Sequence, residues 1–424
     1  MLGTIAFGVF GLTVLVSIAW TICPNKKAID WKLVTSGIGL QLLFAVLVIL
    51  VPGGRDVFDV LSKIFVEIVG FALVGARFIF GDLASIESFG FVFAFQVLPT
   101  IIFFASLMAV LYHLGIMQKI VQGMAWVMLK VLRVSGGESL SVAANVFVGQ
   151  TEAPLVVRPY IARMTESELF TMMVGGMATI AGAVLAAYIA MLGGGDEAAR
   201  LFYARHLLAA SVMAAPATIV IAKLLKPETG ESLTKGSVKL EVEKTAGNVI
   251  EAAANGAGDG VRLALNVGGM LLAFIALIAM IDYPLAWLGE ITGLETTIGQ
   301  PLSLSVILGY LLSPLAWVIG VPWEDAVTVG GLIGTKAVTN EFVAYSDLVA
   351  LKDTMTPKAV LISTYALCGF ANFSSIAIQI GGIGGLAPNR KPDIARLGLY
   401  AVLGGTLATM MTATIAGVLT TIAA

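Results

Sequence analysis

The sequence predicts an all-α polytopic membrane protein with eight transmembrane helices and two re-entrant hairpins, arranged as inverted repeats with broken helices. Three observations lead to this fold class. The chain has 424 residues, of which 58% are hydrophobic and only 12% are charged, whereas a soluble domain carries about 25% charged residues. Eight apolar runs are long enough to cross a bilayer. Two further segments carry a glutamate between apolar stretches that are too short to cross it twice.

The predicted spans are 2–22, 33–52, 88–117, 169–192, 201–225, 262–287, 358–387 and 396–421. The first run lacks the basic leading region of a signal peptide, and lysines follow it, so we expect it to be a transmembrane helix. Basic clusters lie at 26–32, 119–133, 158–163, 223–244 and 390–396. If both termini lie outside, every cluster faces the cytoplasm, as the positive-inside rule requires. Arg55, Arg77, Lys352 and Lys358 are exceptions on the outer side, but they are fewer.

Other segments have compositions that do not suit a span. Residues 119–133 and 303–320 are apolar to amphipathic, and we expect them to be interfacial helices that brace the hairpins. Residues 226–260 are polar and glycine-containing, and are predicted to be a cytoplasmic connector.

Some acidic residues have a structural explanation. Thr165 and Glu168 have the spacing of a capping box at the start of the fourth span. Glu324 and Asp325 follow Pro322 and suit a helix N-terminus. These residues are therefore not candidates for a binding site.

The two glutamate segments are 149–154 and 339–345. A carboxylate at mid-bilayer depth costs about 2.5–3.5 kcal/mol. Non-helical backbone at that depth is tolerated only where it is buried in protein or lines a cavity. We therefore interpret both segments as hairpin tips that line a substrate site inside the membrane.

The second half of the chain repeats the first. An Ala-Trp-Val sequence at 125–127 precedes one glutamate segment much as 316–318 precedes the other. Glycine mixed with hydroxyl or amide side chains follows at 175–182 and at 368–375, a composition typical of helices interrupted at mid-membrane depth.

The predicted topology makes the two halves inverted, because one hairpin is entered from the cytoplasm and the other from outside. This arrangement is typical of secondary transporters that use alternating access. Packing by small residues would explain the glycines but not the glutamates.

Several function classes are disfavoured. Residues 331–336 lack the pattern of a phosphate-binding loop, so transport would be driven by an ion gradient. Cys23 and Cys368 are too few for a disulfide framework, and a net charge of -2 gives no basic patch for nucleic acid. His113 and His206 are interpreted as hydrogen-bonded helix-interface residues. Neither lies near a glutamate motif, which argues against a hydrolase and against enzymatic activity generally. A channel suits these hairpins less well than a carrier.

Three motifs resemble one known family. The run 334–345, GTKAVTNEFVAY, looks like the signature of the concentrative nucleoside transporter family, and 149–154 and 369–375 resemble its two other conserved segments. The absence of extra N-terminal spans resembles the bacterial members, which implies a bacterial cell (inner) membrane. The resemblance also implies a homotrimer of protomers that each contain a scaffold domain and a moving, elevator-like transport domain.

The resemblance divides the chain into four parts. Residues 1–118 would be scaffold spans one to three, and 119–225 the first half of the transport domain. Residues 226–302 would hold the connector, scaffold span six and an external loop. Residues 303–424 would complete the transport domain.

The resemblance also implies a nucleoside-binding set. Glu341, Asn372 and Ser375 would bind the ribose hydroxyls, for which a charged acceptor is well suited. The base would be read by Gln150, Thr151 and Glu152. Phe370 and Val184 belong to the same set as apolar contacts, with Leu263 or Leu265 of span six as a further aliphatic contact.

Sodium is the coupling ion that the resemblance implies. Its ligands would be Asn145, Val148, Thr179 and Ile180, as side-chain or carbonyl oxygens that suit a hard cation. The family usually has serine at the position of Thr179, and threonine keeps the oxygen while adding a methyl group. Two alternatives stay open: proton coupling, and sodium symport of another neutral polar solute. Two carboxylates at the tips argue against an anionic substrate.

Overall fold

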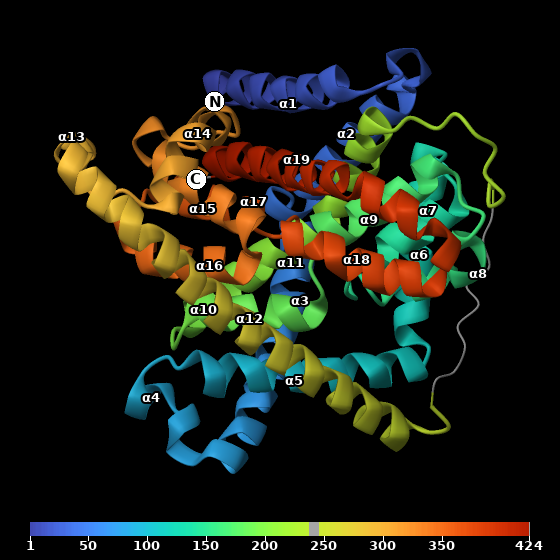
Figure 1. The fold of residues 1–424 in the computed structure, drawn as a ribbon. Helices are drawn as coiled ribbons and strands as arrows, with labels where there is room; N and C mark the ends of the chain where they lie inside the picture. The colour runs from blue at the N-terminus through green and yellow to red at the C-terminus, as the bar shows by residue number, and fades with distance from the viewer. Residues whose placement is uncertain (237–245, 424) are drawn as a thin grey trace.

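The computed structural model describes residues 1–236 and 246–423, and all regular secondary structure in those ranges is helical (Figure 1). Seven helices in the described ranges are long and apolar enough to cross a membrane. The chain is therefore a multi-pass α-helical protein. The predicted fold class is confirmed at this level.

The first part of the chain contains one long helix that the sequence analysis missed. Its helices are α1 (Leu2–Ile22), α2 (Trp31–Ile49), α3 (Pro52–Phe80), α4 (Ile86–Phe89) and α5 (Phe93–His113). Helix α3 carries charged residues along its length, so it contains no uninterrupted apolar run long enough to be predicted as a membrane span. Helix α5 is shorter than the predicted span 88–117, because α4 is a separate turn before it.

The two halves of the predicted repeat contain the same order of helices. The first half has α6 (Ile116–Leu132), α7 (Gly136–Asn145), η3 (Ala153–Val157), α8 (Arg158–Ile161), α9 (Glu166–Ala178), α10 (Gly182–Gly193) and α11 (Glu197–Leu225). The second half has α14 (Leu304–Val318), η4 (Trp323–Asp325), α15 (Ala326–Val338), α16 (Glu341–Leu351), α17 (Pro357–Ala366), α18 (Phe373–Leu386) and α19 (Lys391–Ala423).

Each half contains an irregular tip and a helix break. We call residues 146–152 the first tip and 339–340 the second tip. The first break, 179–181, separates α9 from α10, and the second break, 367–372, separates α17 from α18. Both interruptions fall within or beside the glycine-containing segments in which the sequence predicted them.

Between the two halves lies α12 (Val249–Thr292), which extends over 44 residues and is followed by α13 (Leu294–Ile298). Helix α12 begins at 249, so the last part of the predicted connector 226–260 is helical and continuous with the predicted span six. The Asn248 side chain accepts a hydrogen bond from the Glu251 amide and caps this helix. The central part of the predicted connector, 237–245, lies outside the described residues.

The acidic residues assigned to helix starts lie at helix starts. Thr165 and Glu168 form the predicted capping box of α9. Glu324 and Asp325 lie in η4, immediately before α15. Asp325 also accepts hydrogen bonds from the backbone amide and the hydroxyl of Thr356, which links the start of α15 to the start of α17.

The helices differ strongly in how much of their apolar surface is buried. In the most apolar stretch of α9–α10 and of α11, 89% of residues are buried, and 83% are buried in α19. The corresponding figures are 22% for α1, 28% for α5 and 11% for α12. Figure 1 shows α19 crossing the molecule between other helices. Helix α12 lies at the periphery of the molecule and crosses α5. The chain therefore has a buried central group of helices and a peripheral group.

Helices α1 and α19 pack antiparallel to one another. A Cβ on Gly8 would touch Val418, and one on Gly11 would touch Thr414. The start of α1 thus lies beside the end of α19, and both termini are at the same end of this pair (Figure 1).

The seam between α12 and α5 depends on two glycines one helical turn apart. A Cβ on Gly256 would lie 2.7 Å from the Ala105 carbonyl oxygen, and one on Gly260 would lie 2.7 Å from the Ile102 Cα. Small residues at this spacing allow helix backbones to approach closely in membrane proteins. Gly258, on another face of α12, has no atom within 4 Å of its Cβ position.

We expect Gly260→Ala to lower the thermal unfolding temperature, because the methyl group would overlap backbone that cannot move without separating the helices. The cost should be about 1–3 kcal/mol, as for overpacked cores. Gly258→Ala is the matched control and should leave the unfolding temperature unchanged or raise it, since alanine is the better helix former. Equal effects of the two substitutions in detergent-solubilised protein would contradict the importance of this seam.

Candidate functional site

The two helix breaks lie against each other at the centre of the molecule. A Cβ on Gly369, in the second break, would lie 2.9 Å from the Met177 carbonyl oxygen and 3.1 Å from the carbonyl carbon of Ala178. Met177 and Ala178 are the last residues of α9. Only a glycine allows this approach, so the composition of the second break is explained by contact with the first.

The first tip is connected to α18 by a chain of side-chain hydrogen bonds. Gln150 is 7% exposed, and its Nε2 donates to Ser375 Oγ at 3.0 Å. Gln379 Nε2 donates to Gln150 Oε1 at 3.1 Å and to the Met173 carbonyl at 2.9 Å. The structure therefore brings together Gln150 and Ser375, which were predicted from motifs 225 residues apart.

Gln379 is fully buried and was missed by the sequence analysis. It lies one helical turn after Ser375 on the same face of α18. That spacing, together with an amide in an otherwise apolar helix, was the available signal. The motif segment 369–375 ends one helical turn before Gln379.

Glu341 occupies a buried position at the start of α16. Its exposure is 3%, and Asn372 Nδ2 donates to Glu341 Oε2 at 2.9 Å. The Asn372 Oδ1 accepts from the Ser375 amide at 2.9 Å and thereby caps α18. Because the cap fixes the oxygen of this side chain, its NH₂ group must face Glu341. A carboxylate in the first turn of a helix is also stabilised by the helix dipole.

Thr151 and Glu152 lie at the outer part of the first tip. Thr151 is half-buried, and Glu152 is exposed. The sequence places both glutamates at hairpin tips, but the structure gives them different surroundings. Glu341 begins a regular helix inside the core, whereas Glu152 ends an irregular segment before η3.

The residues predicted to bind an ion lie between α7 and the first break. Asn145 is 1% exposed, and its Nδ2 donates to the Ser141 carbonyl at 3.0 Å. Its Oδ1 is buried and has no hydrogen-bond partner among the described residues. Gly175, one turn before Thr179, allows the Asn145 side chain to approach α9, since a Cβ there would lie 3.3 Å from Nδ2.

The first break is also held to the first tip. Thr179 is 2% exposed, its backbone is extended, and its hydroxyl donates to the Gly175 carbonyl at 2.8 Å. The Gly182 amide donates to the Phe147 carbonyl at 3.0 Å. Ile180 is fully buried, and Val148 is half-buried in the tip. The four residues predicted to bind the ion, Asn145, Val148, Thr179 and Ile180, offer neutral oxygen atoms and include no acidic side chain.

The predicted apolar contacts lie in different surroundings. Phe370, in the second break, is half-buried, and Val184 is 2% exposed in α10. Leu263 packs partly against the core. Leu265 is 69% exposed on the opposite side of α12. Of the two leucines named for span six, only Leu263 faces the interior.

Lys336 is a second buried polar residue that the sequence analysis did not select. It lies in α15, is 1% exposed, and its Nζ donates to the Ala366 carbonyl at 2.8 Å. In the sequence, this lysine ends the segment 331–336, which lacks the pattern of a phosphate-binding loop. Its burial is a consequence of tertiary packing around the second break.

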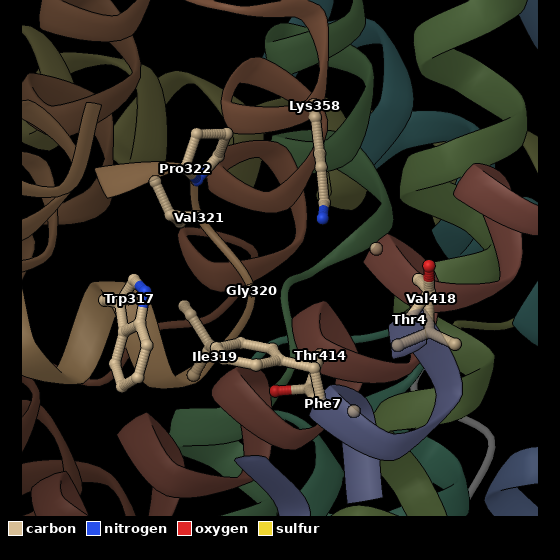
Figure 2. A pocket seen from close by; sticks show the side chains of 12 residues that line it. Thr4, Phe7, Trp317, Ile319, Gly320, Val321, Pro322, Lys358, Thr414 and Val418 are labelled. Carbon is tan, nitrogen blue, oxygen red and sulfur yellow. The ribbon is translucent and has the colours of Figure 1, made fainter. Parts of the chain in front are cut away.

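The cavity in Figure 2 is separate from all these residues. It lies between α1, the end of α14, the start of α17 and the second half of α19, with Lys358 pointing into it. His206 is also elsewhere: its Nδ1 lies 2.9 Å from the Tyr365 hydroxyl, as expected of a hydrogen-bonded helix-interface histidine. The described residues contain no group of three His, Cys, Asp or Glu side chains that could hold a metal ion.

Models of one protein family match most of the chain. Residues 10–83 match the N-terminus, and 206–417 the C-terminus, of the Na+ dependent nucleoside transporter family. Residues 94–195 match a model described as nucleoside recognition.

Similar proteins come from bacteria and mammals. A nucleoside permease, NupC, of Helicobacter pylori is 42% identical over 421 residues, which cover 97% of each chain. An uncharacterized transporter of Haemophilus influenzae is 46% identical over 96% of each chain. The sodium/nucleoside cotransporter 1 of Rattus norvegicus is 40% identical over 96% of this chain and 63% of its own length.

Solved structures of CNTnw have the same fold. An inward-facing, substrate-bound state superimposes with a TM-score of 0.89 at 46% identity and covers 98% of this chain and 99% of CNTnw. A double variant in an outward-facing state gives a TM-score of 0.88 at 45% identity, with 99% and 98% coverage. By sequence along nearly its whole length and by fold, this chain belongs to the concentrative nucleoside transporter family.

Proposed function

We propose that this protein imports nucleosides by sodium symport across a bacterial inner membrane, with elevator-type alternating access. The observation that carries the proposal is the convergence of two tips and two helix breaks around Gln150, Glu341, Asn372 and Ser375. Family membership supports nucleoside transport. The coupling ion, the roles of individual residues and the mechanism are our inference.

Glu341 is the proposed acceptor for the ribose hydroxyls. An ionised carboxylate has about four lone-pair sites, and Asn372 occupies one of them on Oε2. The remaining capacity suits a vicinal diol, whose hydroxyls donate. Asn372 and Ser375 complete this shell, because the α18 cap holds them beside the carboxylate.

The first tip is the proposed site of base recognition. The amide of Gln150 presents both a donor and an acceptor, and Ser375 and Gln379 fix its orientation. Thr151 and the exposed Glu152 would reach polar edges of the base directly or through water. Phe370 would pack against the face of the base, and Val184 and Leu263 would add apolar contact.

Sodium is proposed to bind at the first break. The unpartnered, buried Oδ1 of Asn145 is the observation that supports an ion here, since a buried acceptor without a partner costs about 1–3 kcal/mol. The Thr179 hydroxyl and the carbonyls of Val148 and Ile180 are the other proposed ligands. Neutral oxygens suit a hard monovalent cation, whereas in the proton-coupled alternative Glu152 or Glu341 would carry the proton.

The division into buried and peripheral helices supports the proposed scaffold and transport domains. The heavily buried α9–α10, α11 and α19 belong to the proposed transport domain, and the exposed α1, α5 and α12 to the scaffold. The exposed apolar face of α12 would contact lipid or other protomers of the proposed homotrimer. With both termini at the same end of the α1–α19 pair, an external N-terminus implies an external C-terminus.

The transport activity itself is tested in proteoliposomes. We expect saturable uptake of radiolabelled uridine that requires an inward sodium gradient and is competed by nucleosides but not by free ribose, amino acids or dicarboxylates. Uptake driven by a proton gradient alone would establish the proton-coupled alternative. Competition by an unrelated neutral solute with equal potency would contradict nucleoside specificity.

Glu341→Gln should lower nucleoside affinity about 10- to 100-fold, because a hydrogen bond to a charged group contributes about 1.5–3 kcal/mol. Uridine binding to the purified protein at saturating sodium is the measurement. Glu324→Gln is the matched control, since Glu324 is exposed in η4. Wild-type affinity in Glu341→Gln would remove this residue from the site.

Asn145→Ala should raise the sodium concentration for half-maximal uridine uptake about 5- to 10-fold. This change corresponds to about 1–1.4 kcal/mol of sodium-binding free energy, as expected for the loss of one ligand. Asn266→Ala, on the exposed side of α12, is the control. An unchanged sodium requirement in Asn145→Ala would exclude this ion site.

A further inference from the structure

Lys336 is a buried cation that forms no direct ion pair, although the buried carboxylate of Glu341 is near enough to attract it. The other buried lysine among the described residues, Lys223, forms an ion pair with Glu138. No ion pair of the described residues includes Lys336. An ammonium group buried without such a partner is costly, so its position calls for a specific role.

The contacts of Lys336 are oxygen atoms at the second break. Its Nζ donates to the carbonyl of Ala366 at 2.8 Å and to the Thr409 hydroxyl of α19 at 3.3 Å. Ala366 is the last residue of α17. The last carbonyls of a helix have no intrahelical partner and carry its partial negative charge. The ammonium group thus neutralises the end of a half-helix that stops inside the core.

In the internal repeat, the position equivalent to Lys336 lies in the first tip. If the two halves are aligned so that Glu152 matches Glu341, the position equivalent to Lys336 is Phe147. If Ala178, the last residue of α9, is instead matched to Ala366, the last residue of α17, the position equivalent to Lys336 is Val148. These two residues lie in the tip that faces the first break, where the proposed sodium ion binds.

We propose that Lys336 is a tethered cation that supplies, at the second break, the positive charge that sodium supplies at the first. This inference rests on the proposed sodium coupling. Because the charge is covalently attached, the second break and the Asn372–Glu341 pair are held in place without an ion. Only the first tip, with Gln150, then depends on sodium for its order.

The test measures uridine binding to the purified full-length protein as a function of sodium concentration. Lys336→Met keeps the volume of the side chain but removes its charge, and should lower uridine affinity about tenfold or more at every sodium concentration. Lys336→Ala leaves space beside the Ala366 carbonyl and the Thr409 hydroxyl. We expect sodium to enter this space at high concentration, so that affinity partly recovers and the sodium activation curve becomes steeper than in the wild type.

The matched control is Lys352→Met. Lys352 Nζ also donates to a carbonyl near the end of a helix, that of Leu192 in α10, at 3.0 Å, but away from both breaks. This variant should bind uridine with wild-type affinity and wild-type sodium dependence. Its role is to separate the loss of a helix-end contact in general from the loss of the cation at the second break.

Three outcomes would overturn the inference. One is wild-type affinity in Lys336→Met, and another is an activation curve in Lys336→Ala that is no steeper than in the wild type. If neither variant folds, Thr409→Val provides the test. It keeps the shape of the side chain and removes one acceptor for Lys336, and should weaken uridine binding about three- to tenfold. The third contradicting outcome is unchanged uridine binding in Thr409→Val. A wild-type protein that ignores sodium would instead refute the proposed function.

Discussion

The architecture depends on one constraint: backbone groups released where a helix breaks inside an apolar protein must find partners within the protein. The chain satisfies this constraint by setting the two breaks against each other at Gly369 and Met177 and by surrounding them with amides and hydroxyls. The carbonyl of Ala366 accepts a hydrogen bond from Lys336, and the carbonyl of Phe147 accepts one from the Gly182 amide. The same polar groups that satisfy the breaks form the candidate site, so stability and function share one set of residues.

The two halves of the repeat perform this task with different chemistry. In the second half, the buried Glu341 accepts a hydrogen bond from Asn372, and Lys336 donates to the last carbonyl of α17. Asn340 Nδ2 and Gln379 Oε1 are buried there without a hydrogen-bond partner among the described residues. The first half leaves an acceptor on Asn145 without a partner and leaves Glu152 exposed. The two halves therefore differ in charge: the second holds a buried lysine at the end of α17, whereas the first offers the neutral Asn145 oxygen to the proposed sodium ion.

Much of this arrangement was predictable because membrane sequence is restrictive. Glutamates and clustered amides stand out against apolar residues, so the two tips and the two breaks could be located from the sequence. The roles of the candidate site residues came from the resemblance of the motifs and stay predictions. Helix α3 was missed because its charges interrupt the apolar pattern, and the start of α12 because glycine there serves packing against α5. Gln379 has a sequence signal, its amide one turn after Ser375, but its partners lie up to 229 residues away in the chain. Lys336 has none, since its contact with the Ala366 carbonyl arises only from tertiary packing. The unequal burial of Glu152 and Glu341 also arises only from the tertiary structure.

The central claim is that the two breaks together form one nucleoside site. An experimental structure of the protein with uridine and sodium bound tests it most directly. The account predicts ribose hydroxyl oxygens within about 2.6–3.2 Å of the Glu341 carboxylate, with the base between the first tip and Phe370. Uridine bound in the cavity beside Lys358, or held by the first tip alone with Glu341 uninvolved, would contradict it.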